Sequence, residues 1–134
     1  MIETLSISSK DVFKNSVGLE IEKCNEELKS GYVSTIGFKC GNVDTLSFVF
    51  EKELLEEVGE LMMIGSDEEA IIDLSCELAN LIAGHAKVLI KDKGSLCDIS
   101  TPNFFGKKDI NSGNTSLSFL CNGSRFSIFL GRCS

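Results

Sequence analysis

Long hydrophobic runs are absent from this sequence of 134 residues. No stretch approaches the roughly 20 apolar residues that a membrane-spanning helix needs, because charged residues interrupt the longest candidates. Residues 1–5 have neither a basic start nor an apolar core, so we expect no secretory signal. These absences predict a cytoplasmic protein without a membrane segment.

Histidine and proline each occur once, and the six cysteines form no closely spaced pair. The closest two, Cys121 and Cys133, are 12 residues apart, and there is no CxxC motif. Structural zinc sites usually take their ligands from closely spaced pairs, so we expect no zinc site. Without a secretory signal, and with apolar neighbours beside most cysteines, the sequence favours reduced and mostly buried thiols.

Basic residues are outnumbered, since 13 Lys and Arg face 20 Asp and Glu, and the net charge is −7. The basic residues are scattered, and their best local cluster is only Lys107 and Lys108. Nucleic-acid binding requires clustered cations, so we expect no nucleic-acid partner. No linker or low-complexity stretch divides the chain, which predicts a single domain over residues 1–134.

The periodicity of apolar residues predicts an α+β fold. The expected elements are a short helix at 8–16 with Val12 and Phe13 inward, a strand at 19–22, strands at 32–40 and 43–50, a helix from 51 that ends before 65–67, a helix at 68–87, and strands at 115–121 and 125–130. Residues 94–113 are expected to be irregular, and residues 88–90 fit either a strand or the end of the helix. Tight hairpins make antiparallel strands, so we predict a two-layer domain in which two long adjacent helices cover an antiparallel sheet of hairpins.

Three short polar segments predict where the elements end. Gly41-Asn42 and Asn122-Gly123 each separate two apolar runs and favour the positive φ angles of tight hairpin turns. Ser66 or Asp67 is a suitable N-cap for the helix that follows.

The predicted helix at 68–87 carries one narrow polar line on a largely apolar surface. At about 100° per residue, Asp73, Glu77, Asn80 and Gly84 fall within a sector of roughly 60°. A glycine inside a helix costs about 1 kcal/mol relative to alanine, which suggests that another group approaches closely there. From periodicity alone an alternative stays open, in which Gly84 relieves internal packing and the acids simply face water.

The same segment resembles the signature of the CheC/CheX chemotaxis phosphatases. That signature has an Asp or Ser, a Glu after three intervening residues, an Asn after two more, and a later proline; Asp73, Glu77 and Asn80 match it, and Pro102 lies near the expected place. One copy of the motif is visible, as in CheX. The first predicted helix has no second copy, since its polar residues do not have the Glu-x-x-Asn spacing.

The resemblance implies a phosphatase that removes phosphate from the aspartate of a CheY-like receiver domain. It assigns to Asn80 the orientation of the attacking water, as the Gln of small GTPases does, and to Glu77 a salt bridge with the receiver's active-site lysine. Asp73 is expected to orient the helix or contact the partner, and Gly84 to let the two backbones come close. The family also implies a homodimer, no cofactor of its own, and Mg²⁺ on the receiver.

Other readings of the polar line stay open. The chain could bind a receiver or another signalling partner without catalysis, because proteins that share a fold do not always share an activity. A metal-dependent hydrolase using Asp73 and Glu77 would need further ligands from elsewhere in the chain. Cys76 borders the line, but acidic neighbours do not suit a reactive thiolate, and His85 is expected to be structural on the apolar side.

Overall fold

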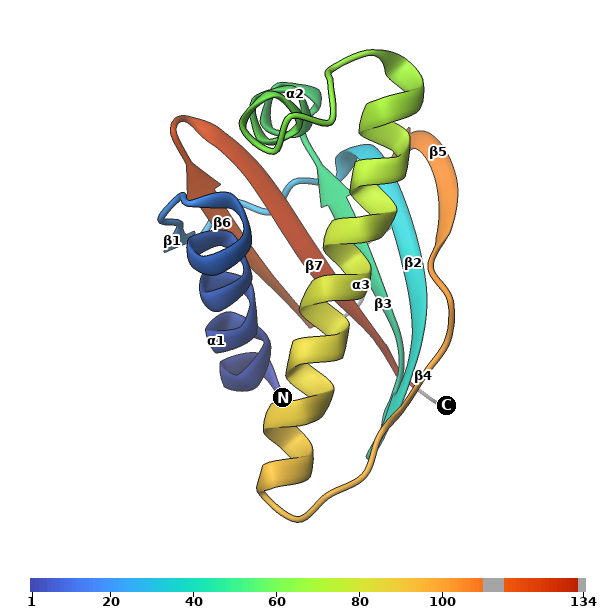
Figure 1. Ribbon diagram of the computed structural model, residues 1–134. Helices are drawn as coiled ribbons and strands as arrows, with labels where there is room; N and C mark the ends of the chain where they lie inside the picture. The colour runs from blue at the N-terminus through green and yellow to red at the C-terminus, as the bar shows by residue number, and fades with distance from the viewer. Residues whose placement is uncertain (110–114, 133–134) are drawn as a thin grey trace.

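The computed structural model describes residues 1–109 and 115–132, which form one antiparallel sheet with helices on one face (Figure 1). The helical elements are α1 (Ile2–Val12), the π-helical turn η1 (Phe13–Val17), α2 (Lys52–Leu61) and α3 (Glu68–Asp92). The strands are β1 (Glu22–Cys24), β2 (Ser30–Cys40), β3 (Val43–Phe50), β4 (Asp98–Ile99), β5 (Asn103–Asp109), β6 (Ser116–Cys121) and β7 (Ser124–Arg132). The predicted two-layer α+β class is confirmed.

The sheet is built around the two predicted hairpins. Its strand order is β1-β6-β7-β3-β2, and β4 and β5 both pair with the outer edge of β2. The β2–β3 turn has Gly41 at φ 62°, and the β6–β7 turn has Asn122 at φ 49° and Gly123 at φ 85°. These are the left-handed conformations that tight hairpins require, so the turn residues specify the hairpins locally.

Two predictions about the strands were wrong. Residues 19–21 precede β1, which begins at Glu22; Leu19 and Ile21 pack on the core without pairing in the sheet. Within residues 94–109, which were expected to be irregular, β4 and β5 form ladders with β2. These strands show no alternation of apolar and polar residues, and they form only by pairing with β2, which lies more than fifty residues earlier in the chain. Residues 110–113 of that prediction lie outside the described ranges.

The β2–β4 ladder also corrects the prediction for the cysteines. Phe38 pairs with Ile99 and Lys39 with Asp98, so the next step of the ladder places Cys40 beside Cys97. These two cysteines form a disulfide across 57 residues of sequence, with their Cα atoms 4.7 Å apart. The sequence could not predict this contact because it depends on a strand that local patterns do not show.

The other described cysteines are free. Cys24 and Cys76 are half-buried, and Cys121 is buried. Burial, with a smaller contribution from Glu57, raises the pKa of the Cys121 thiol, which keeps it protonated and unreactive at neutral pH. Cys133 lies outside the described residues.

The helices that lie side by side across the sheet are α1 and α3, whereas α2, which was predicted to cover the sheet beside α3, packs near one end (Figure 1). Helix α3 continues through residues 88–90, which settles the open choice in favour of helix. Helix α1 begins at Ile2, earlier than expected, and buries hydroxyl residues such as Ser8, whose Oγ donates to the Ile82 carbonyl at 2.6 Å. Serine is a weak helix former, so local propensity gave little sign of this helix. No helix in the described ranges is long and apolar enough to cross a membrane.

An aromatic cluster joins both layers at the end of α1. The Phe126 ring of β7 lies 5.2 Å from that of Phe13, 5.5 Å from that of Phe50 and 5.0 Å from that of Phe119, measured between centroids. All four residues are fully buried. Phe13, predicted to point inward, therefore holds the start of η1 against Phe126 of β7, which in turn packs on β3 and β6.

Polar contacts fix the start of α3. Asp67 caps the helix by accepting a hydrogen bond from the Ala70 amide at 2.8 Å. The Tyr32 hydroxyl donates to Glu68 Oε2 at 2.7 Å, and Lys107 Nζ lies 2.9 Å from Glu68 Oε1. The hydrogen bond from Lys107, and then that from Tyr32, lowers the pKa of the Glu68 carboxyl. This network joins the first turn of α3 to strands β2 and β5.

The lowered pKa predicts a pH-dependent contribution to stability. A carboxyl with a depressed pKa stabilises the folded state above its ordinary value of 4.5 and loses this contribution as pH falls through the lowered value. We expect Glu68→Gln to reduce the free energy of unfolding in urea at pH 7, and the deficit to shrink at pH 3. The matched control is Glu69→Gln, an exposed neighbour in the same helical turn. A deficit that is equal at both pH values would contradict the role of the Glu68 charge.

Gly84 allows a second prediction, because a Cβ built on it would have no non-neighbouring atom within 4 Å. Internal packing therefore does not require glycine at this position. We expect Gly84→Ala to raise the free energy of unfolding by about 1 kcal/mol, the helix-propensity difference between the two residues. The control is Gly59→Ala in α2, where the new Cβ would overlap the Gly65 carbonyl oxygen and should destabilise the protein. Destabilisation by Gly84→Ala would restore the packing explanation.

Candidate functional site

The polar line lies on the outer face of α3. Asp73, Glu77 and Asn80 are exposed, and Gly84 is half-buried. Residues on the opposite side of the helix, such as Leu78, are buried in the core. The structure thus brings all four predicted site residues onto one solvent-facing strip, one helical turn apart.

The side chains of Asp73, Glu77 and Asn80 have no hydrogen-bond or ion-pair partner among the described residues. Other carboxylates of the protein do have partners, for example Glu68 with Lys107 and Glu51 with Arg125. Two carboxylates and a carboxamide on one face are therefore available to groups outside the chain. Such a strip can pair with a cation and hold a water molecule through the amide oxygen.

A groove of about 470 Å³ runs beside this strip, between α3 and the end of α1 with η1. Its walls are formed on one side by Asn80, Leu81, Gly84, His85 and Val88, and on the other by Asp11, Val12, Asn15 and Ser16. The predicted site is thus wider than the helix on which its motif lies.

Across this groove, His85 Nε2 lies 3.1 Å from Asp11 Oδ2. The His85 side chain is 36% exposed, so the residue lies at the boundary between α1 and α3 and not within an apolar face. The pair bridges the two helices that form the groove. Sequence reasoning could not predict it, because Asp11 and His85 are separated by 74 residues.

Cys76 lies beside the strip and points toward the sheet. Its sulfur is 3.5 Å from Ser34 Oγ, which in turn lies 2.8 Å from Ser75 Oγ. In the described ranges, no group of three or more His, Cys, Asp or Glu side chains could hold a metal ion. The described residues therefore do not supply the further ligands that a metal site at Asp73 and Glu77 would need.

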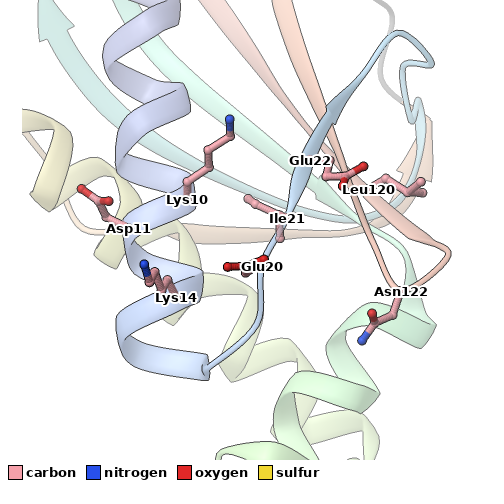
Figure 2. A pocket seen from close by; sticks show the side chains of 8 residues that line it. All are labelled: Lys10, Asp11, Lys14, Glu20, Ile21, Glu22, Leu120 and Asn122. Atoms are coloured by element: carbon pink, nitrogen blue, oxygen red, sulfur yellow. The ribbon is translucent and has the colours of Figure 1, made fainter.

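A second cavity, of about 520 Å³, opens on the other side of α1, near β1 and the β6–β7 turn (Figure 2). Figure 2 shows Lys10 and Lys14 on the α1–η1 side, and Glu20 and Glu22 on the segment opposite. Asp11 also contributes to its lining, so lysines and acids offset one another. None of the four predicted site residues reaches this cavity.

The sequence missed the wall of the groove that α1 and η1 provide. Asn15 and Ser16 lie in the π-helical turn η1, which no local pattern indicates. Their placement depends on the burial of Phe13, which holds the turn against the core. The signal lies in the tertiary packing and not in the spacing of the polar residues.

The family model described as "Chemotaxis phosphatase CheX" matches residues 32–122, more than half of the chain. No curated protein sequence matches it. Among solved structures, the chemotaxis protein CheX from Vibrio vulnificus is 19% identical to this chain, with a TM-score of 0.82. The match covers 96% of this chain and 93% of the Vibrio chain.

Two further structures share the fold. A CheC-like superfamily protein from Shewanella sp. PV-4 is 26% identical, with a TM-score of 0.71, and the match covers 97% of this chain and 96% of the Shewanella chain. The CheX of the CheX–CheY–BeF3–Mg²⁺ complex from Borrelia burgdorferi is 18% identical, with coverages of 99% and 97% and a TM-score of 0.72. The match of the family model across most of the fold, including the whole of α3, decides the assignment: the chain belongs to the CheX family of chemotaxis phosphatases.

Proposed function

We propose that this protein hydrolyses the aspartyl phosphate of a CheY-like receiver domain, using Glu77 and Asn80 of α3. The observation that carries the proposal is the exposed strip of α3, where both side chains face outward without a partner among the described residues. The match to the chemotaxis phosphatase family supports the reaction class. The structurally similar CheX from Borrelia burgdorferi forms a complex with CheY, BeF3 and Mg²⁺, which supports a receiver as the partner.

Asn80 is proposed to place the attacking water. An aspartyl phosphate is already reactive, so hydrolysis mainly requires a water in line with the bond between phosphorus and the aspartate oxygen. The amide oxygen of Asn80 would accept a hydrogen bond from that water, while its NH₂ group donates to another acceptor. Attack by the water oxygen breaks the phosphorus–aspartate bond and releases inorganic phosphate and the free carboxylate.

Glu77 is proposed to dock the helix by pairing with the lysine near the receiver's phosphorylation site. It precedes Asn80 by one helical turn, so a contact at Glu77 would set the position of Asn80 over the phosphoryl group. A general-base role for Glu77 is less favoured, since a loose transition state makes little use of early proton removal. Asp73, one turn further toward the start of α3, would orient the helix on the partner, and Gly84 would allow close backbone approach.

The proposal assigns no cofactor to this chain. Mg²⁺ would be held by the receiver, where it neutralises charge on the phosphoryl oxygens. We also propose a homodimer. In the part of the chain that the structure describes, β1 and β5 each pair with only one neighbouring strand, so either edge could accept a strand from a second copy.

Asn80→Ala provides the first test of the chemistry. We expect the rate of phosphate loss from a saturating phosphorylated receiver to fall by about 10²-fold, the typical cost of removing one preorganised group. Binding should be retained. The matched control is Asn25→Ala, an exposed asparagine between β1 and β2 that should leave the rate unchanged. The measurement follows receiver dephosphorylation with a panel of CheY-like receivers.

The wild-type protein distinguishes the two proposed classes of function. If it binds a phosphorylated receiver but does not accelerate phosphate loss, catalysis is excluded and the chain is a binding module. If Asn80→Ala retains full activity, the water is positioned by another group.

Glu77→Gln tests the docking role. Removing the charge should raise KM for the phosphorylated receiver more than it lowers kcat, because the salt bridge would act mainly in complex formation. The dependence of KM on ionic strength should also weaken. The control, Glu60→Gln, removes an exposed charge from α2 outside the strip. A fall in kcat alone, with KM and its salt dependence unchanged, would contradict docking and favour a role in the chemical step.

A further inference from the structure

We propose that the groove between α3 and the α1–η1 segment is a specificity pocket that receives one apolar side chain of the receiver, next to the receiver's phosphorylated aspartate. The inference rests on the proposed function, because it takes the receiver as the partner. It adds a second contact region to the strip on α3. The occupant is a neutral, apolar side chain, and the phosphoryl group itself stays at Asn80.

The position of the groove makes contact with the partner unavoidable. Asn80 is part of the groove wall, and Gly84 follows it by four residues, or about 6 Å along the helix. A typical protein interface covers about 800 Å² on each partner, a patch several helical turns wide. Any receiver that brings its phosphoryl group to Asn80 therefore also covers the mouth of the groove.

The lining favours an apolar occupant. Among the lining residues, Val88 is 53% exposed and Val12 is buried. Of the polar lining residues, Asp11 and His85 contact each other, and the exposed Asn15 and Ser16 lie on the wall formed by η1. No Lys or Arg lines this groove, so among its described residues it offers no strong site for a phosphate. Apolar side chains accompanied by a few polar groups that have no strong charge to offer a ligand are usual in a pocket for a partner's anchor side chain.

Gly84 leaves this pocket open. A Cβ at this position would meet no other described side chain within 4 Å, so the protein's own side chains do not fill the space. A larger residue would project into the groove and exclude the partner. The glycine thus fits close approach by an external group better than it fits internal packing.

The two walls are held at a fixed spacing before any partner binds. The hydrogen bond from Ser8 to the Ile82 carbonyl, at 2.6 Å, is buried between α1 and α3. His85 and Asp11 bridge the same helices at 3.1 Å. Phe13, stacked on Phe126, anchors the π-helical turn that carries Asn15 and Ser16, and such turns occur frequently at functional sites. A preformed pocket binds with a smaller loss of conformational entropy.

Two variants test the pocket from independent directions. Gly84→Leu fills it, and Val88→Asp adds a charge that would be buried on docking. We expect each to raise KM for the phosphorylated receiver by about tenfold or more, the usual loss at an anchor position, while kcat at saturation stays within about threefold. Asn80→Ala should show the opposite pattern, with kcat reduced and KM little changed. Leu96→Asp, an 81% exposed leucine outside the groove, serves as the matched control.

Thermal unfolding of each variant shows whether the fold is retained, and binding to a receiver loaded with BeF3 and Mg²⁺ gives a readout independent of turnover. Unchanged KM and binding for both variants would overturn the pocket and leave the proposed function intact. A fall in kcat with unchanged KM would also overturn it, because the groove would then act in the chemical step. If the wild-type protein neither binds nor dephosphorylates any receiver, the proposed function fails and the inference fails with it.

Discussion

The apolar face of α3, packed on the sheet and against α1, is the contact on which the arrangement of the site depends. Leu74, Leu78 and Ile82 are almost completely buried along this face. Burying each such side chain contributes about 1.5–3 kcal/mol, whereas an exposed ion pair contributes about 0–1 kcal/mol. The core therefore sets the rotation of the helix, and the direction in which Glu77 and Asn80 point is a consequence. The polar strip does not have to stabilise the fold, so its side chains remain available to a partner.

Because the buried face of α3 holds the helix in place, the exposed strip can be rigid without being built into the core. The Asp67 cap and the contacts of Glu68 with Tyr32 and Lys107 fix the first turn of α3. Further along, contacts with α1 restrict the helix near Gly84. Phosphoryl transfer depends on positioning, and a long helix held at several points can keep one carboxamide in place. The proposed reaction would need little more from this chain, since the receiver would supply the metal and the phosphorylated carboxylate.

Much of the fold could be predicted because its signals are local. Gly41 and the Asn122-Gly123 pair specify turns through positive φ angles, and these turns define the two central hairpins. The 3.6-residue period of α3 predicted both the helix and the common face of its four polar residues. Each of these turns and helix faces is specified by residues only a few positions apart in the sequence. The chemical roles of Glu77 and Asn80 are different, since they came from family resemblance and remain proposals.

The sequence by itself determined the hairpins, the amphipathic helices and the strip on α3, because each depends on residues only a few positions apart. Tertiary structure alone decided the pairing of β4 and β5 with β2, and with it the Cys40–Cys97 disulfide. It also decided the early start of α1, whose buried serines favour a helix only when α3 lies beside them. Tertiary structure also decided the groove, since Asp11 and His85, which meet across it, are 74 residues apart in the sequence. Such contacts depend on which surfaces pack together, and no local spacing encodes that choice.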